Sequence, residues 1–201
     1  MPWRAFAELL RFPYMEPLNR PAVIVADMLV DFVTGALANP PSQACIAPIA
    51  RLLAGARERG WPVCFVNDAH LPGDVEEGLW GPHALAGTPG AQVIPELAPQ
   101  PGDVQFAKRW YSGFHETGLG MSLRQHGVET VILTGQHAHI CVQHTAADAC
   151  IDGFRVVLAE DGISAFTPED MAAGMTYMQA MYGAVAGTVD EILAAPPASA
   201  A

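Results

Sequence analysis

Residues 131–142 read Val-Ile-Leu-Thr-Gly-Gln-His-Ala-His-Ile-Cys-Val, and this stretch decides the fold. The residues before Gly135 predict a buried strand that ends at this glycine, and Cys141 falls in the first turn of a predicted helix over 141–152. The start of a helix carries positive potential and free backbone N–H groups. The turn could therefore supply a thiolate nucleophile and donors for an oxyanion. Taken alone, the stretch is also explained by a buried cysteine in an ordinary βα unit.

Alternating strand and helix patterns on both sides of this stretch predict an α/β protein. Continuous apolar runs are typical of strands in a parallel sheet, and right-handed βαβ connections place helices on both of its faces. Residues 69–103 are rich in glycine and proline and are expected to form a long functional loop. The expected strands are 22–26, 63–66, 104–107, 130–134, 155–159 and 185–189, and the expected helices are 43–59, 116–126, 141–152 and 168–182.

The composition favours one well-buried domain. The chain has 201 residues, of which 51% are hydrophobic and 15% charged, and one core is the default at this size. We expect an apolar arm over 1–21, a folded domain over 22–193 and a disordered tail over 194–201. The net charge of −11 argues against nucleic-acid binding. The arm and the low charge fraction predict a homo-oligomer.

The cysteine pattern and the hydropathy bear on the compartment. The four cysteines form no CxxC pair, which argues against a zinc ribbon or a thioredoxin motif. Cys45, Cys64 and Cys150 are predicted to be core residues. No signal peptide and no membrane-spanning run is recognisable, so we expect neither secretion nor a membrane partner. Free thiols fit a reducing compartment, and the cytoplasm is the expected location.

Reactive side chains follow four of the predicted strands. Asp27, Asp68 and Lys108 stand where three strands end, and Cys141 follows the turn after a fourth. Ligands of open parallel sheets bind beyond the carboxyl ends of the strands, so these side chains are expected at one edge. Each has an ordinary alternative, such as a turn former or a surface lysine. Their coincidence at one edge favours an active site.

Asp27, Lys108 and Cys141 would form a coherent catalytic set. The Cys141 thiolate would attack a carbonyl carbon and form a thioester, while Asp27 takes the thiol proton and passes it to the leaving amine. Lys108 is expected to hold the carboxylate and to lower the pKa of the thiol. The backbone N–H groups of His137 and Cys141 would stabilise the oxyanion. For the side chains of His137 and His139 we expect a structural role.

A second set of residues predicts a metal site in the long loop. Asp68, His70 and His83 offer one carboxylate and two imidazoles, which suit Zn, Fe or Mn with open positions left over. Glu76 or Glu77 could add a further ligand. Two histidines in a loop often bind nothing, but the expected proximity to Cys141 favours a divalent metal, with Zn as the leading candidate.

Together these residues resemble the isochorismatase-like cysteine hydrolases, and among them the nicotinamidase/pyrazinamidase group. The resemblance covers roughly residues 22–190. It implies a three-layer α/β/α fold with a six-stranded parallel sheet, and an Asp27–Lys108–Cys141 triad. It also implies a cis peptide near Gln136–His137. The matching segments are 25–32, 68–70, 80–91, 108–114 and 135–149.

In the nicotinamidase group, the resemblance implies that Asp68, His70 and His83 bind the metal and that the metal binds the ring nitrogen of the substrate. Phe32 and Trp80 would flank the aromatic ring. The leading hypothesis is therefore a metal-assisted amidase that converts nicotinamide to nicotinate and ammonia.

Two alternative functions stay open. Val30 and the pair Ala138-His139 depart from the usual nicotinamidase pattern, which favours the same triad acting on another small amide, carbamoyl or ureido compound. A non-catalytic binding module is the third hypothesis, and the intact triad argues against it.

Overall fold

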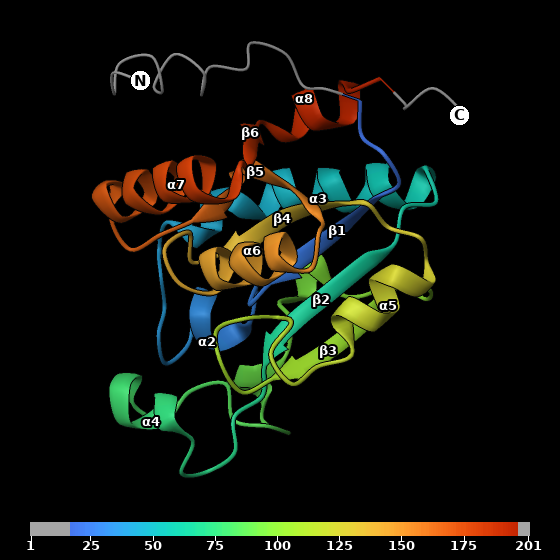
Figure 1. Cartoon of the computed structure of the whole chain (residues 1–201). Helices are drawn as coiled ribbons and strands as arrows, with labels where there is room; N and C mark the ends of the chain where they lie inside the picture. The colour runs from blue at the N-terminus through green and yellow to red at the C-terminus, as the bar shows by residue number, and fades with distance from the viewer. Residues whose placement is uncertain (1–16, 197–201) are drawn as a thin grey trace.

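The computed structural model describes residues 17–196, and its elements alternate between strands and helices (Figure 1). All six strands are parallel, in the order β3-β2-β1-β4-β5-β6. The predicted six-stranded α/β fold is thus confirmed. The strands are β1 Pro21–Ala26, β2 Val63–Asp68, β3 Val104–Lys108, β4 Thr130–Gln136, β5 Arg155–Ser164 and β6 Val185–Gly187. The helices are α2 Val30–Val33, α3 Ser42–Glu58, α4 Val75–Trp80, α5 Leu119–Gln125, α6 Cys141–Ile151, α7 Pro168–Tyr182 and α8 Val189–Ala194, with short 3-10 turns η1 Pro89–Ala91 and η2 Pro95–Leu97.

Helices cover both faces of the sheet, as the uninterrupted apolar strands require. In β1, alternate residues point to opposite faces, so Ile24 packs with α5 and α6, and Val25 packs with α3. Helix α7 joins the first face through Met178, and α8 joins the second through Ile192. The two apolar cores leave the carboxyl edge of the sheet free for polar side chains, and this edge holds the site.

The sequence pattern predicted that this strand ends at Gly135, but β4 continues through Gln136. Gly135 has a φ of 105°, and a Cβ there would collide with the carbonyl oxygen of Ala26. Glycine therefore permits a close approach to β1 instead of stopping the strand. The register between β4 and β5 shifts at this point, and β5 extends to Ser164, five residues beyond its predicted end.

Larger differences from the prediction occur in the long loop, in the helix after it and in the last strand. The long loop over 69–103 contains α4, η1 and η2, and the helix expected over 116–126 is shortened to α5. The sixth strand ends at Gly187, because Thr188 and Glu191 form a capping box that starts α8. Ala194 therefore belongs to this helix and not to a disordered tail.

Residues 1–16 of the predicted apolar arm and residues 197–201 of the predicted tail lie outside the described residues, so the prediction for them stays a prediction, whereas Pro21 already begins β1. Within residues 17–196, no helix has both the length and the apolar character needed to cross a bilayer.

Candidate active site

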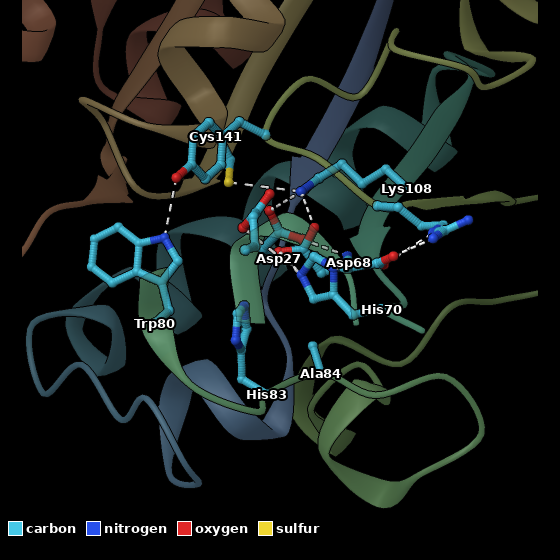
Figure 2. A network of polar contacts seen from close by, with 12 residues as sticks. Asp27, Asp68, His70, Trp80, His83, Ala84, Lys108 and Cys141 are labelled. Atoms are coloured by element: carbon cyan, nitrogen blue, oxygen red, sulfur yellow. Dashed lines mark hydrogen bonds and ion pairs between the residues drawn. The ribbon is translucent and has the colours of Figure 1, made fainter. Parts of the chain in front are cut away.

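The carboxyl edge of the sheet brings Asp27, Asp68, Lys108 and Cys141 together (Figure 2). Asp27 follows β1, Asp68 and Lys108 are the last residues of β2 and β3, and Cys141 is the first residue of α6. Because β1, β2 and β3 are adjacent and parallel, their ends meet at one place. The predicted arrangement of these four side chains is confirmed.

Lys108 links the two carboxylates to the thiol. Its Nζ lies 2.8 Å from Asp27 Oδ2, 2.5 Å from Asp68 Oδ1 and 3.7 Å from Cys141 Sγ. Burial acts to lower the pKa of Lys108, but the two carboxylates outweigh it and hold the pKa well above its usual value. The ammonium is therefore a permanent positive charge between the two acids.

Asp27 is placed to act as a base. Burial, helped by the charge of Asp68, raises the pKa of the Asp27 carboxyl to about 6, against the opposing influence of Lys108. At neutral pH the carboxylate form still predominates, and it is far more basic than an ordinary aspartate. The backbone N–H of Asp68 donates to Asp27 Oδ1 at 2.8 Å, which leaves Oδ2 for Lys108.

Lys108 acts to lower the pKa of the Cys141 thiol, as expected, but other influences outweigh it. Burial raises the pKa of Cys141, Lys108 lowers it, and the charges of Asp27 and Asp68 raise it further, so the pKa lies well above its usual value. In this structure Cys141 is a thiol that needs a base at the moment of attack. The raised pKa of Asp27 makes this carboxylate a stronger base for taking the proton from the thiol.

The turn before α6 presents two backbone donors. Within residues 17–196, the N–H groups of His137 and Cys141 have no hydrogen-bond partner. The turn is held by the N–H of Ala138, which donates to the Ser164 carbonyl at 2.8 Å. The Gln136–His137 peptide is cis, as the resemblance implied. Backbone donors without partners at the start of the helix that carries the thiol are what an oxyanion hole requires.

A second polar cluster adjoins the first. The candidate ligand atoms of Asp68, His70, Glu76 and His83 all lie within 4.8 Å of one another, and all four residues are buried. Asp68 Oδ2, His70 Nε2 and Glu76 Oε1 are buried without a hydrogen-bond partner. Buried polar atoms without partners are costly, and this set of oxygen and imidazole donors matches what Zn, Fe or Mn bind.

Neighbouring groups orient the two imidazoles. His83 Nδ1 lies 2.7 Å from the Gly81 carbonyl oxygen, which favours a proton on Nδ1 and leaves Nε2 for a metal. His70 Nδ1 lies 3.5 Å from Asp74 Oδ2, and Asp74 is in turn ion-paired to Arg109. The residues present thus fit a divalent ion. Glu76 is part of the cluster, whereas Glu77 accepts a hydrogen bond from Gly73 instead.

A cavity of about 220 Å³ opens beside Cys141. Phe32 and Trp80, which the resemblance placed around the substrate ring, both line it, and the Trp80 Nε1–H donates to the Tyr111 hydroxyl at 3.1 Å (Figure 2). The walls are mostly apolar or aromatic, with acidic and imidazole groups from the second cluster. The lining residues are Phe32, Leu37, Ala38, Asp68, Glu76, Trp80, His83, Tyr111, His137, Ile140, Cys141 and Phe166.

A sequence model of the Isochorismatase domain matches residues 21–190. The chain belongs to the isochorismatase family. This membership confirms the resemblance that the strand-end residues indicated.

This isochorismatase-family chain is similar to two amidases of known structure and to one enterobactin synthase component. N-carbamoylsarcosine amidase from Thermoplasma acidophilum is 39% identical, with a TM-score of 0.80 over 88% of this chain and 98% of that one. Pyrazinamidase of Pyrococcus horikoshii, solved in complex with zinc, is 29% identical, with a TM-score of 0.79 over 85% of this chain and 99% of that one. Enterobactin synthase component B of Escherichia coli K12 is 30% identical over 189 residues, which span 91% of this chain but only 66% of that protein. The chain is therefore an isochorismatase-like hydrolase whose relatives include amidases.

Two aromatic residues of the cavity wall, Tyr111 and Phe166, were not predicted from the sequence. Tyr111 follows Lys108 closely, so its place near the strand ends could have been inferred. Phe166 follows β5 and packs against His137 in a tilted arrangement, with ring centroids 4.1 Å apart. Its place was hidden because β5 was expected to end at residue 159. The His137 ring is buried and lines the cavity, so it contributes to the wall beyond the structural role expected for it.

Proposed function

We propose that this protein is a cysteine amidohydrolase that converts nicotinamide to nicotinate and ammonia. The observation that carries the proposal is the cavity between Cys141 and the cluster of Asp68, His70 and His83, with Phe32 and Trp80 in its walls. An aromatic carboxamide fits such a cavity, because its ring needs apolar walls and its amide must reach the thiol.

The residues of the chain support a two-stage reaction. Asp27 takes the Cys141 proton as sulfur attacks the amide carbon, and the N–H groups of His137 and Cys141 hold the developing oxyanion. Asp27 then gives the proton to the departing ammonia, leaving a thioester. A water molecule, deprotonated by the same carboxylate, hydrolyses the thioester and restores the thiol.

We further propose that Asp68, His70 and His83, together with Glu76, hold a divalent metal ion. The buried atoms without partners in this cluster support the assignment, as does the zinc in the pyrazinamidase structure. A bound ion would supply a Lewis acid for the ring nitrogen of the substrate. Trp80 and Phe32 would orient the ring, and Lys108 would keep Asp27 in place.

The described side chains of the cavity offer no cationic partner for an anionic substrate. Among the described residues that line it, none is lysine or arginine, whereas two are acidic. A substrate with its own carboxylate would have no cationic side chain in the wall to bind it. The second candidate is a carbamoyl compound, which the 39% identity to an N-carbamoylsarcosine amidase favours.

A substrate panel separates the two candidates. We expect ammonia release from nicotinamide and pyrazinamide, with kcat/KM at least about tenfold above that for N-carbamoyl amino acids, a difference of about 1.4 kcal/mol in transition-state stabilisation. The measurement is coupled ammonia detection with equal enzyme concentrations. Ammonia from a carbamoyl compound but none from nicotinamide would support the second candidate and exclude the first.

Removing a metal ligand tests the second cluster. We expect His70→Ala to lose bound divalent metal. We also expect KM for nicotinamide to rise, because the ring nitrogen of the substrate would lose the ion that binds it. Metal content by elemental analysis and steady-state kinetics check this. The matched control is His126→Ala, which replaces an exposed histidine at the C-terminal end of α5 and should keep both properties. Undiminished metal content in His70→Ala would contradict the assignment.

A further inference from the structure

Beneath the candidate oxyanion turn lies a buried cluster of three polar side chains that the reaction scheme does not use. Asn39 comes from the segment between α2 and α3, Gln136 ends β4 and Ser164 ends β5. Their exposed fractions are 3%, 0% and 3%. Burying uncharged polar groups costs free energy unless they are hydrogen-bonded, so the partners of these side chains matter.

Gln136 is the centre of the cluster. Its Nε2 donates to the backbone carbonyl of Asp27 at 3.0 Å. Its Oε1 accepts from Asn39 Nδ2 at 3.3 Å and from Ser164 Oγ at 3.2 Å. Asn39 and Ser164 therefore fix the orientation of the Gln136 amide, with the donor end facing Asp27.

The contact to Asp27 bears on the proposed base. Asp27 has a φ of 53°, in the left-handed region that non-glycine residues adopt at a cost. The hydrogen bond from Gln136 to its carbonyl stabilises this conformation, which directs the carboxylate to Lys108. The cluster also reaches the turn: His137 follows Gln136, and the Ser164 carbonyl accepts from the Ala138 N–H.

We propose that Gln136, oriented by Asn39 and Ser164, is a positioning residue that fixes the Asp27 carboxylate relative to the Cys141 turn. Gln136 touches no substrate and acts through Asp27. The inference rests on the proposed amide hydrolysis, and it requires no particular amide. Losing the donor would let Asp27 relax, and a displacement of about 1 Å can cost about 100-fold in rate.

The test compares two replacements of Gln136 with a matched control. Gln136→Met keeps the shape but removes both polar ends, and Gln136→Glu keeps the acceptor but removes the amide donor. For both we expect kcat to fall about 10- to 100-fold while KM changes less than about threefold. Thr134→Val is the control: Thr134 is equally buried in the same strand and donates at 2.5 Å to the Gly162 carbonyl, away from the site. It should lose stability but keep kcat.

Two additions keep the test decisive. Ser164→Ala removes only one donor to Gln136 and should lower kcat by about threefold to tenfold, even if the Gln136 variants fold poorly. The double variant Asn39→Ala/Gln136→Met should be no slower than Gln136→Met alone, since both act through one hydrogen bond to Asp27.

An amide-exchange measurement reads the position of Asp27 without any substrate. The Asp68 N–H donates to Asp27 Oδ1 at 2.8 Å, so its hydrogen exchange should speed up about tenfold or more in Gln136→Met, but not in Thr134→Val. Unchanged kcat and unchanged Asp68 exchange in Gln136→Met would overturn the inference. A wild-type chain inactive on every amide would refute the proposed function alone, and the exchange rates would still decide the positioning role.

Discussion

Replacing Cys141 by alanine is expected to lower amide turnover by at least about 10,000-fold, because the covalent route disappears entirely. Asp27 and Lys108 would remain, but neither can replace sulfur as the nucleophile in this geometry. We expect the fold to survive, since Cys141 is a small side chain at the start of α6 and its loss leaves only a minor cavity. Ammonia release under single-turnover conditions and the circular-dichroism spectrum check the two parts.

Cys150→Ala is the matched control for this prediction. Cys150 is a free cysteine on the same helix, half-buried, with its Sγ 3.8 Å from the Tyr182 carbonyl oxygen. Its replacement should leave kcat within about twofold, because it has no contact with the reacting groups. Comparable ammonia release by Cys141→Ala and Cys150→Ala would exclude Cys141 as the nucleophile.

Replacing Lys108 by methionine is expected to destabilise the protein by about 3–5 kcal/mol at pH 8, the usual cost of leaving a buried charge without its partner. Asp27 and Asp68 would then face each other as two buried carboxylates with no ammonium between them. Turnover should fall as well, since Asp27 would protonate and lose its function as a base. Urea unfolding of metal-free wild-type and variant proteins measures the stability difference.

The pH dependence of this loss has a definite sign. Without Lys108, the pKa of Asp27, which is already raised, moves further above the unfolded value of about 3.9, and the pKa of Asp68, which Lys108 helps to lower, rises as well. The penalty is absent where both states are protonated, and it grows as the pH rises from the unfolded pKa through the folded one. The difference between variant and wild type should therefore be smaller at pH 5 than at pH 8.

Arg51→Met provides the matched control for the loss of a cation with two acidic partners. Arg51 pairs with Asp161 and Asp190 at 3.7 and 3.4 Å, but its side chain is 50% exposed. Its removal should cost no more than about 1 kcal/mol at either pH. An equal loss for Arg51→Met and Lys108→Met would show that the buried ion pairs of Lys108 with Asp27 and Asp68 contribute no special stabilisation.

The sequence alone determined which reactive side chains stand at the ends of the strands. Continuous apolar runs predicted the strands, and the residues that end them, Asp27, Asp68 and Lys108, were recognisable as polar side chains following apolar runs. Parallel topology then brings strand ends together irrespective of the details of packing. Asp27, Lys108 and Cys141 could therefore be placed at one edge from the sequence alone. The same holds for His70 and His83 in the adjoining loop.

Only the tertiary structure decided how these groups behave. The pKa of Cys141 depends on its burial and on two carboxylates as well as on Lys108. These influences come from residues far apart in the sequence, so a local sequence pattern cannot predict their combined effect. The partner of Gln136 lies 109 positions away in the chain. Phe166 reaches the cavity because β5 continues beyond its predicted end, past the irregularity at Gly135. Local sequence determines strands and their ends because hydrophobic periodicity is a short-range property; protonation and side-chain orientation depend on groups that only folding brings into contact.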